Sequence, residues 1–200
     1  MATRFIFVGN ALWLDFVNTK IVDDGKPVDL LGSFDDLLAW LSEVGVPVQN
    51  HSWSAAQQKT LLESARKFRD TLRATAEQFY AKKEPSKSPI ELINSILACK
   101  WTSPRLKQSA HTFQRKYATK LIRPEQILVP IAESVLELLC DGNTKLIKKC
   151  GNKECILYFY DSTKNHKRRW CSMEGCGNRM KVAAYWERRR KNLTVKTQRS

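Results

Sequence analysis

Apolar residues in the first 144 positions recur at the three- and four-residue spacing of amphipathic helices. The first such segment begins after Ser33, which can form a capping box with Asp36, and Gly45 is suited to its end. The longest segment follows Ser54, with Gln57 at the capping-box position. We therefore predict two helices here, and the apolar face of the longer one consists of Leu61, Leu62, Ala65, Phe68, Leu72, Ala76 and Phe79.

Two further helices are predicted in this part of the chain. Pro85 ends the long helix, and Ser88, Pro89 and Glu91 then resemble an N-cap, a first-turn proline and a capping-box glutamate. A fourth helix is expected between positions 124 and 142, with an apolar face of Ile127, Leu128, Ile131, Val135, Leu138 and Leu139. Both patterns have the period of a helix packed against a core.

The remaining segments have weaker patterns. Residues 102–122 contain a polar, partly alternating stretch, which allows a short hairpin. Residues 3–8 are interpreted as a strand or an extended arm. The fold class expected is mainly α (α+β), with a helical domain over residues 1–144 and a small second module over residues 145–200.

Composition and charge support this division. The chain has 200 residues, of which 42% are hydrophobic, enough to bury a proper core, and its formal net charge is +14. Residues 145–200 carry 16 Lys and Arg against four acids, a balance of +12, whereas residues 1–144 carry 18 against 16, a balance of +2. A local cationic excess attracts polyanions such as nucleic acids, although a solubilising basic tail is the alternative.

Four of the six cysteines form two spaced pairs within the basic module. The pattern is Cys150-x4-Cys155, 15 intervening residues, and Cys171-x4-Cys176. Two such pairs are typical of a closed tetrahedral site for one structural Zn²⁺. An iron–sulfur cluster is the rival interpretation, and His166 is a less favoured fourth ligand. Cys99 and Cys140 lie in apolar stretches, and we expect both to be small buried hydrophobic residues.

The order of elements in the module predicts a treble-clef-like arrangement. A strand is expected at Ile156–Tyr160, a turn at Asp161–Asn165 and a returning strand through Arg168–Trp170, so that a hairpin separates the two cysteine pairs. A helix should follow over residues 177–186. The aromatic residues of the module are expected to form its small core and its contact with the helical domain, rather than to stack on bases; they are Tyr158, Phe159, Tyr160, Trp170, Tyr185 and Trp186.

Two stretches of this sequence resemble known families. Residues 171–179, Cys-Ser-Met-Glu-Gly-Cys-Gly-Asn-Arg, preceded by Asp161, Lys164-Asn165 and Arg168-Arg169-Trp170, resemble the CGNR zinc finger. Residues 9–19 and the later Asp35-x-Leu37-x-x-Trp40-Leu41 resemble the ABATE domain that usually precedes this finger. The resemblance implies a bacterial, stress-related transcription regulator with a C-terminal DNA-binding zinc finger.

Nucleic-acid binding requires Lys, Arg and amide donors for phosphates and base edges. The candidates form a loop group and a group on the helix after the last cysteine: Lys164, Asn165, Lys167, Arg168 and Arg169, then Asn178, Arg179, Lys181, Arg188, Arg189 and Arg190. Asn178 and Arg179 have the chemistry to read adenine and guanine, but a structural role beside the metal is at least as well supported.

Three functional hypotheses remain open from the sequence. The first is a DNA-binding regulator whose helical domain senses a small molecule or forms a homodimer. The second is an RNA-binding module, and the third is a zinc-stabilised module that binds a protein partner. Asp15, Asn18 and Thr19 are candidates for lining an effector pocket, although local hydrogen bonding is the favoured interpretation of these residues.

Other classes of protein are not expected. The sequence contains no glycine-rich phosphate loop, Ser/His/Asp set or dense carboxylate pair, so we predict no enzyme. Its apolar runs fall far short of the roughly 18 to 20 residues of a membrane span, and no signal peptide is recognisable. A cytoplasmic protein with no membrane partner is therefore expected.

Overall fold

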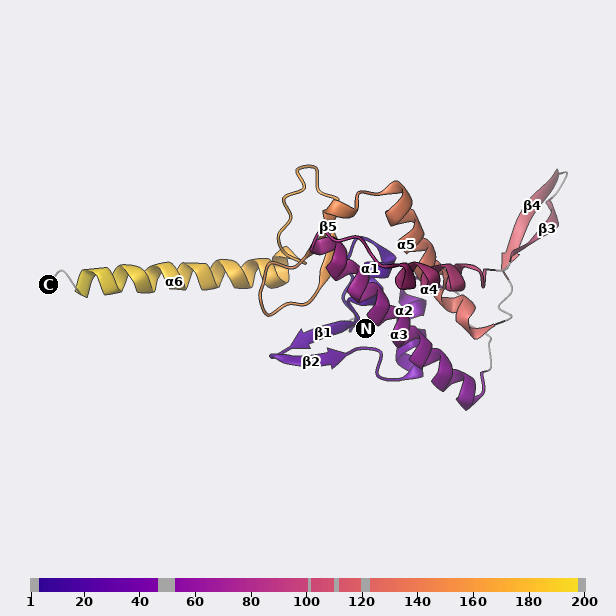
Figure 1. Cartoon of the computed structure of the whole chain (residues 1–200), viewed down its shortest axis with the longest axis horizontal. Coiled ribbons are helices and arrows are strands. Elements are labelled where there is room, and N and C mark those ends of the chain that lie inside the picture. Colours follow the sequence, from indigo (N-terminus) through magenta and orange to yellow (C-terminus); the bar gives the residue numbers. More distant parts are fainter. Residues whose placement is uncertain (1–3, 47–52, 101, 110–111, 120–122, 198–200) are drawn as a thin grey trace.

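The computed structural model describes residues 4–46, 53–100, 102–109, 112–119 and 123–197 (Figure 1). These ranges are mainly helical, as predicted, with two-stranded antiparallel sheets β1–β2, β3–β4 and β5–β6. The helices are α1 (Leu12–Val17), α2 (Phe34–Glu43), α3 (Ala55–Tyr80), α4 (Lys87–Leu97), α5 (Val129–Asp141) and α6 (Asn178–Thr197). The strands are β1 (Lys20–Asp23), β2 (Lys26–Asp29), β3 (Thr102–Ser109), β4 (Thr112–Thr119), β5 (Ile147–Lys149) and β6 (Tyr158–Tyr160).

Both predicted capping boxes are present. The Ser33 hydroxyl accepts a hydrogen bond from the Asp36 amide, and the Asp36 carboxylate accepts one from the Ser33 amide at 2.8 Å. Ser54 and Gln57 make the same exchange at the start of α3. Gly45 follows α2 with a φ of +78°, the left-handed conformation that commonly ends a helix.

The predicted starts of the other two helices need correction. α4 begins at Lys87 with Ser86 as its N-cap, so Ser88 lies inside the first turn and does not cap the helix. Pro89 is tolerated there because first-turn amides have no partner within a helix. The fourth helix starts as a 3₁₀ turn at Pro124–Leu128 and becomes α-helical only at Val129.

Sequence analysis did not predict α1 or the β1–β2 hairpin. α1 has only six residues, four of them buried, which is too short to show a helical period. β1 and β2 are joined through Asp24 and Gly25, whose φ angles are +46° and +74°. An Asp-Gly pair with two positive φ angles is the signature of a tight hairpin turn, so this dipeptide was the available signal.

The main core lies around α3, which packs against α1, α2 and α4. Trp13 and Trp40 are fully buried, and the Phe16 ring lies 5.1 Å from the Trp40 ring and 6.3 Å from the Phe68 ring. Pairs of large aromatic rings at these distances bury much apolar area and add a specific geometric preference. The core therefore gives α1 and α3 fixed positions, and these two helices hold the second module.

An ion pair between a buried arginine and a partly exposed aspartate connects α3 to the end of β2. The Arg69 side chain is fully buried and makes two hydrogen bonds of 2.6 Å to the Asp29 carboxylate and a third to Thr19. Burial acts to raise the pKa of Asp29, but the hydrogen bonds and charge of Arg69 lower it overall. Such a two-pronged Arg–carboxylate pair fixes orientation as well as position.

The β3–β4 hairpin confirms the hairpin expected in residues 102–122 and projects from the body (Figure 1). Its register runs from Thr102↔Thr119 to Ser109↔Thr112. The described residues 4–8 form neither a helix nor a strand, so of the two interpretations given for this end the strand is wrong and the arm is left. Cys99 is half-buried and Cys140 is exposed, which corrects the expectation that both are core residues.

None of the helices in the described part of the chain offers the length of uncharged apolar sequence that a bilayer span requires.

Asn18, at the end of α1, joins the helical domain to β6. Its side-chain amide donates to the Tyr158 carbonyl at 2.8 Å and accepts from the Tyr158 amide at 2.9 Å. Both residues are buried, so these bonds satisfy backbone groups that water cannot reach. Sequence analysis expected Asn18 to cap or turn its own segment, and the structure shows a bridge to a residue 140 positions away.

Polar side chains of α3 extend this contact. Arg73 donates to the carbonyls of Ile156, Val17 and Lys20. Glu77 accepts hydrogen bonds from the Tyr158 hydroxyl and from Lys149. Burial, followed by the hydrogen bond to Glu77, raises the pKa of Tyr158, so this hydroxyl remains a donor. The helical domain and the module are therefore joined by side chains that bond directly to the backbone of β6 and its flanks.

Replacing Asn18 with alanine is expected to lower the free energy of unfolding by about 3 kcal/mol, because the two backbone groups of Tyr158 would lose their partners in a buried site. Chemical denaturation of the zinc-loaded protein measures this loss. Asn10→Ala is the matched control, since Asn10 bonds the exposed side of the same segment through the Tyr160 carbonyl. Equal losses of under about 0.5 kcal/mol for both variants would show that the Asn18 bridge does not hold the two parts together.

Candidate zinc centre and basic surface

The four predicted metal ligands come together from three segments. Cys150 directly follows β5, and Cys155 ends the short loop that leads toward β6. Cys171 lies at the end of the long loop 161–172, and Cys176 lies in the π-helical turn Met173–Gly177 that leads into α6. Cys150, Cys171 and Cys176 are buried, and Cys155 is half-buried. The last ligand therefore precedes the final helix directly, close to the predicted arrangement.

The sulfur positions fit one tetrahedral zinc ion. All four Sγ atoms lie within 4.8 Å of one another, and those of Cys155 and Cys171 are 3.8 Å apart. A tetrahedron with zinc–sulfur bonds of about 2.3 Å places its sulfurs roughly 3.8 Å apart. The four cysteines therefore form a site for one structural zinc ion, and four protein ligands leave no open position for water or substrate.

Hydrogen-bond donors surround the sulfurs. The Cys171 amide donates to Cys150 Sγ at 3.4 Å, and the Asn152 amide donates to Cys176 Sγ at 3.6 Å. The hydrogen bond with Cys150 raises the pKa of Cys155 to about 12, and hydrogen bonds with Cys150 and Cys155, together with burial, raise the pKa of Cys171. Hydrogen bonds from Cys155 and Cys171 lower the pKa of Cys150 to about 2. A divalent cation at the centre stabilises all four as thiolates. Asn152 was missed by sequence analysis.

The predicted hairpin between the cysteine pairs is wrong. β6 forms as expected, but it pairs with β5, so that Ile147 lies opposite Tyr160 and the first cysteine pair occupies the connecting loop. Residues 161–172 return as an irregular loop instead of a strand. The reason is that side chains, and not a strand partner, satisfy much of the loop backbone, and Asp161 is the centre of these contacts.

Asp161 is fully buried and organises the loop. Its carboxylate accepts hydrogen bonds from Lys148 at 2.6 Å, from the Thr163 amide and hydroxyl, and from the Arg168 amide at 3.0 Å. Burial opposes ionisation, but these bonds, led by that of Lys148, lower the pKa of Asp161 to about 2. Lys148 also donates to the His166 carbonyl. The ion pair between Asp161 and Lys148 therefore holds this loop in place.

Replacing Asp161 with alanine is expected to lower the free energy of unfolding by about 2 to 3 kcal/mol, because Lys148 would remain partly buried without its counter-ion. Amide exchange should accelerate over residues 162–170. Asp161→Asn is the matched control, since its single amide oxygen can still accept from the Thr163 amide and hydroxyl, and it should cost less. Unchanged exchange over this loop in the alanine variant would contradict the assigned role.

The structure separates the predicted loop cations into two kinds. Lys164, Asn165 and Lys167 are exposed and lie at the loop tip. Arg168 is turned inward, where its guanidinium donates to the carbonyls of Val8, Trp170 and Cys171 and lies 4.2 Å from the Phe159 ring centroid. Arg169 is exposed.

Arg168 therefore has a structural role, because its donors are taken by partly buried carbonyls of the amino-terminal arm and the zinc loop. This assignment corrects its inclusion among the nucleic-acid contacts.

Asp15, a neighbouring effector-pocket candidate, accepts from the Gly9 amide at 2.7 Å, and burial raises its pKa to about 6. Thr19 donates to the Phe16 carbonyl. Local hydrogen bonding, the favoured sequence interpretation, describes both Asp15 and Thr19.

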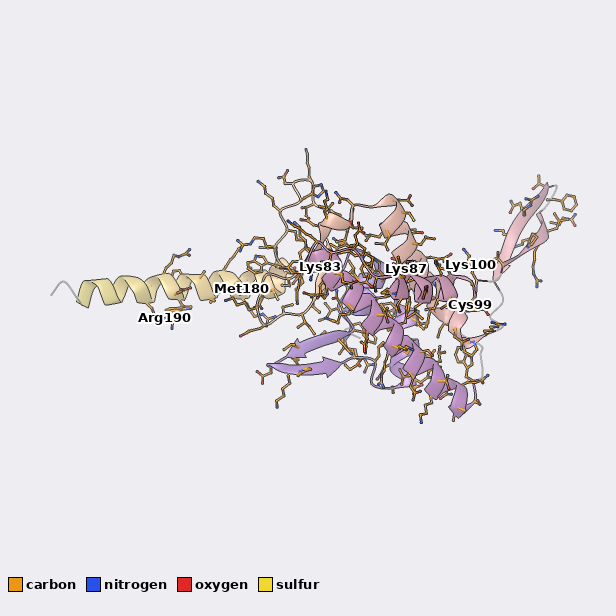
Figure 2. The ribbon with its side chains drawn as sticks, viewed as in Figure 1. Lys83, Lys87, Cys99, Lys100, Met180 and Arg190 are labelled. Atoms are coloured by element: carbon orange, nitrogen blue, oxygen red, sulfur yellow. The ribbon has the colours of Figure 1, made fainter. Side chains whose placement is uncertain are left out.

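The predicted cations of the final helix are exposed on α6, which extends away from the body (Figure 1). Arg179 lies near the zinc centre, where its guanidinium is 3.8 Å from Cys176 Sγ. Asn178, Lys181, Arg188, Arg189 and Arg190 are exposed along the helix. Figure 2 shows Arg190 well beyond the zinc module, with Met180 near the start of the helix.

The aromatic residues also divide into two sets. Tyr158 and Phe159 are buried in the two adjoining cores, as predicted. Tyr185 and Trp186 are instead about half exposed on α6, with their rings 5.5 Å apart, so the expectation that they join the core is wrong. They lie on a helix that has left the body of the molecule, and among the described residues no core packs over them.

Comparison with known families agrees with the geometry of the site. The ABATE family, described as "Putative stress-induced transcription regulator", matches residues 10–142, and the CGNR zinc finger matches residues 147–189. The comparison with curated proteins gives no match. The first match spans more than half of the chain, and the second contains all four cysteines. The chain therefore belongs to the ABATE family and carries a CGNR zinc finger with one structural zinc site.

Proposed function

We propose that this chain is a DNA-binding transcription regulator in which the zinc centre orients α6 toward duplex DNA. The observation that carries the proposal is the excess of cations on α6. The sequence of this helix has seven Lys and Arg against one acid, Glu187, and the exposed Arg179, Lys181, Arg188, Arg189 and Arg190 are distributed around the helix. A surface of this sign neutralises phosphates, which supply most of the affinity for DNA.

The dimensions of α6 also suit a duplex. Its 20 residues extend about 30 Å, close to one turn of B-form DNA, and the major groove admits a single helix. The helix begins directly after the π-helical turn that holds Cys176, so the metal centre sets its direction. Asn178 and Arg179 remain candidates for base contacts, with Arg179 alternatively supporting the sulfur of Cys176.

RNA or single-stranded DNA is the second candidate ligand, and Tyr185 and Trp186 favour it. Their exposed rings lie among the arginines, and Arg189 is 5.5 Å from the Trp186 ring centroid. Aromatic rings beside cations stack on unpaired bases and contribute about 1 to 3 kcal/mol per base. The same rings on a protein-binding surface would pack into an apolar pocket of a partner.

Competition among duplex DNA, single-stranded DNA and RNA of equal length tests the proposal. Fluorescence anisotropy of the zinc-loaded protein should show a preference for the duplex, and Tyr185→Ala combined with Trp186→Ala should reduce duplex affinity by less than about fivefold. A preference for single strands that this double variant abolishes would establish the second candidate instead. If the zinc-loaded protein bound none of the three nucleic acids, the hypothesis that the module binds a protein partner would remain.

The proposed role is binding without catalysis. Four cysteine ligands leave no open coordination position on the zinc ion, so the site cannot activate water. We further propose that the regulator acts in the cytoplasm. That the helical domain forms a homodimer or binds a small-molecule effector stays a prediction.

A further inference from the structure

A large groove lies between the end of α3 and the zinc module. Its volume is about 930 Å³, within the range of pockets that hold cofactors and small ligands. One wall is formed by the last turn of α3 and the residues that follow it, up to Glu84. The facing wall is formed by residues 144–151 and by Arg168 and Arg169 of the zinc loop. A ligand in this groove would touch both the ABATE domain and the CGNR zinc finger.

Gly151 joins the two parts of the facing wall, β5 with its following residues and the zinc loop. Its amide donates to the Arg169 carbonyl at 2.8 Å, and a β-carbon at this position would come within 3.1 Å of that carbonyl and of the Trp170 ring. Any larger residue would therefore push the zinc loop outward. Glycine here keeps Arg169 beside β5 on this wall of the groove.

The groove has an apolar floor and a cationic rim. Phe79 is half-buried, Tyr80 is 48% exposed, and Ile147 of β5 is buried. Seven cations line the groove against one carboxylate, that of Glu84; they are Lys82, Lys83, Lys145, Lys148, Lys149, Arg168 and Arg169. Apolar rings beneath a rim of cations can bind an aromatic group and an anion at the same time.

The protein itself uses only some of these cations. Lys148 is paired with Asp161, Lys149 with Glu77, and Arg168 with backbone carbonyls. Among the described residues, no carboxylate pairs with the other four, Lys82, Lys83, Lys145 and Arg169. Lys82 and Lys83 follow α3, and Lys83 is visible at this position in Figure 2. Lys145 and Arg169 stand on the facing wall.

We propose that this groove binds a small phosphorylated ligand with an aromatic ring, of the nucleoside diphosphate class. Cations without a carboxylate partner on two facing walls favour an anion with several charged oxygens, which can contact more than one of them at once. A diphosphate is such an anion, and lysine and arginine are common phosphate ligands. The base would lie against Phe79 and Tyr80. The site is distinct from the exposed face of α6 and goes beyond DNA binding.

Occupancy of the groove would stabilise the contact between the two parts of the chain. A ligand that binds only the docked arrangement stabilises it in proportion to the logarithm of its concentration. The groove lies beside Glu77 and Lys149, which already connect α3 to β5. Ligand binding therefore reinforces the position of the zinc module relative to the ABATE domain.

Isothermal titration of the full zinc-loaded chain with ADP and with inorganic pyrophosphate tests the proposal without any DNA. Both probes carry a diphosphate, and only ADP carries an aromatic base. We expect ADP to bind at least about tenfold more tightly than pyrophosphate. Tyr80→Ala should remove this difference and leave pyrophosphate binding unchanged. Equal affinities for the two probes, or no binding of ADP, would overturn the proposal.

Charge variants locate the site. Lys82→Glu with Lys83→Glu, and separately Lys145→Glu with Arg169→Glu, should each weaken ADP binding by at least about tenfold. Lys59→Glu with Lys67→Glu is the matched control, since both lysines are exposed on α3 outside the groove, and it should change the affinity by less than about threefold. Equal effects of all three pairs would show only a general charge effect and contradict the site.

A last competition separates this site from the nucleic-acid surface. Duplex DNA should leave bound ADP in place, and ADP should bind equally well to a variant with its α6 arginines reversed. If duplex DNA displaces ADP, the groove belongs to the nucleic-acid surface and the small-ligand proposal is wrong. If ADP binds while no nucleic acid does, the DNA-binding proposal fails and the groove proposal stands.

Discussion

Replacing Cys171 with serine is expected to unfold the zinc module while leaving the helical domain folded. Structural zinc contributes about 10 to 16 kcal/mol in small cysteine-rich modules, far more than the small apolar cluster around Phe159 can supply. The variant should lose its bound zinc, and amide exchange should become fast over residues 147–177. Protection in α3 should persist, because its core is made with α1, α2 and α4.

The matched control for this prediction is Cys140→Ser. Cys140 is exposed at the end of α5, outside the four-sulfur cluster, so the substitution should leave zinc content and exchange unchanged. Metal analysis and hydrogen-exchange mass spectrometry on the same samples measure both effects. If the Cys171 variant kept stoichiometric zinc, or kept slow exchange after losing it, the metal would not be holding the module together.

Reversing Arg188, Arg189 and Arg190 to glutamate is expected to weaken duplex binding by at least about a hundredfold at 0.1 M salt. Each phosphate contact contributes about −0.9 to the slope of log affinity against log salt, so the slope should become shallower by roughly 2 to 3. All three arginines are exposed on α6, outside the zinc site, so the variant should fold and bind zinc normally.

A variant of equal charge change controls for net charge alone. Lys59→Glu, Lys67→Glu and Lys87→Glu alter three exposed lysines of the ABATE domain, two on α3 and one on α4. This control should lose less than about tenfold in affinity. A similar loss for both triple variants would mean that DNA is attracted by overall charge, and α6 would have no special part in binding.

Local chemistry made much of this fold predictable from the sequence. A capping box uses only residues three positions apart, so Ser33 with Asp36 and Ser54 with Gln57 indicated the starts of α2 and α3 directly. The zinc ligands were predictable for a similar reason, because the short loop in each cysteine pair limits how far its sulfurs can separate. Both signals depend little on the rest of the chain.

Long-range contacts explain what the sequence did not reveal. β6 pairs with β5, and Asn18 bonds Tyr158 of β6 from 140 residues away; no local pattern around Tyr158 indicates this bridge. Arg168 looks like a phosphate ligand among its basic neighbours. Its role as a donor to partly buried carbonyls depends on the amino-terminal arm and on Cys171. Charge in the sequence alone cannot distinguish a cation that faces solvent from one that faces carbonyls.

The groove beside α3 shows the same limitation. Lys82 and Lys83 are separated from Arg169 by more than 80 residues, so their shared surface exists only after the zinc module docks. Sequence analysis considered Asp15 and Asn18 as candidates for an effector pocket but favoured local hydrogen bonding, and both side chains are used in internal hydrogen bonds. The cations left unpaired by the fold point instead to the boundary between the two parts of the chain.

Affinity of the zinc-loaded chain for duplex DNA, measured across a salt series, tests the central proposal most directly. We predict sub-micromolar binding at low salt, with log affinity falling linearly against log salt at a slope of about −4 or steeper, which corresponds to at least four or five neutralised phosphates. Removal of zinc should abolish this binding. Binding that does not change with salt, or its absence in protein with one zinc per chain, would contradict the assignment of α6 as a DNA-binding element.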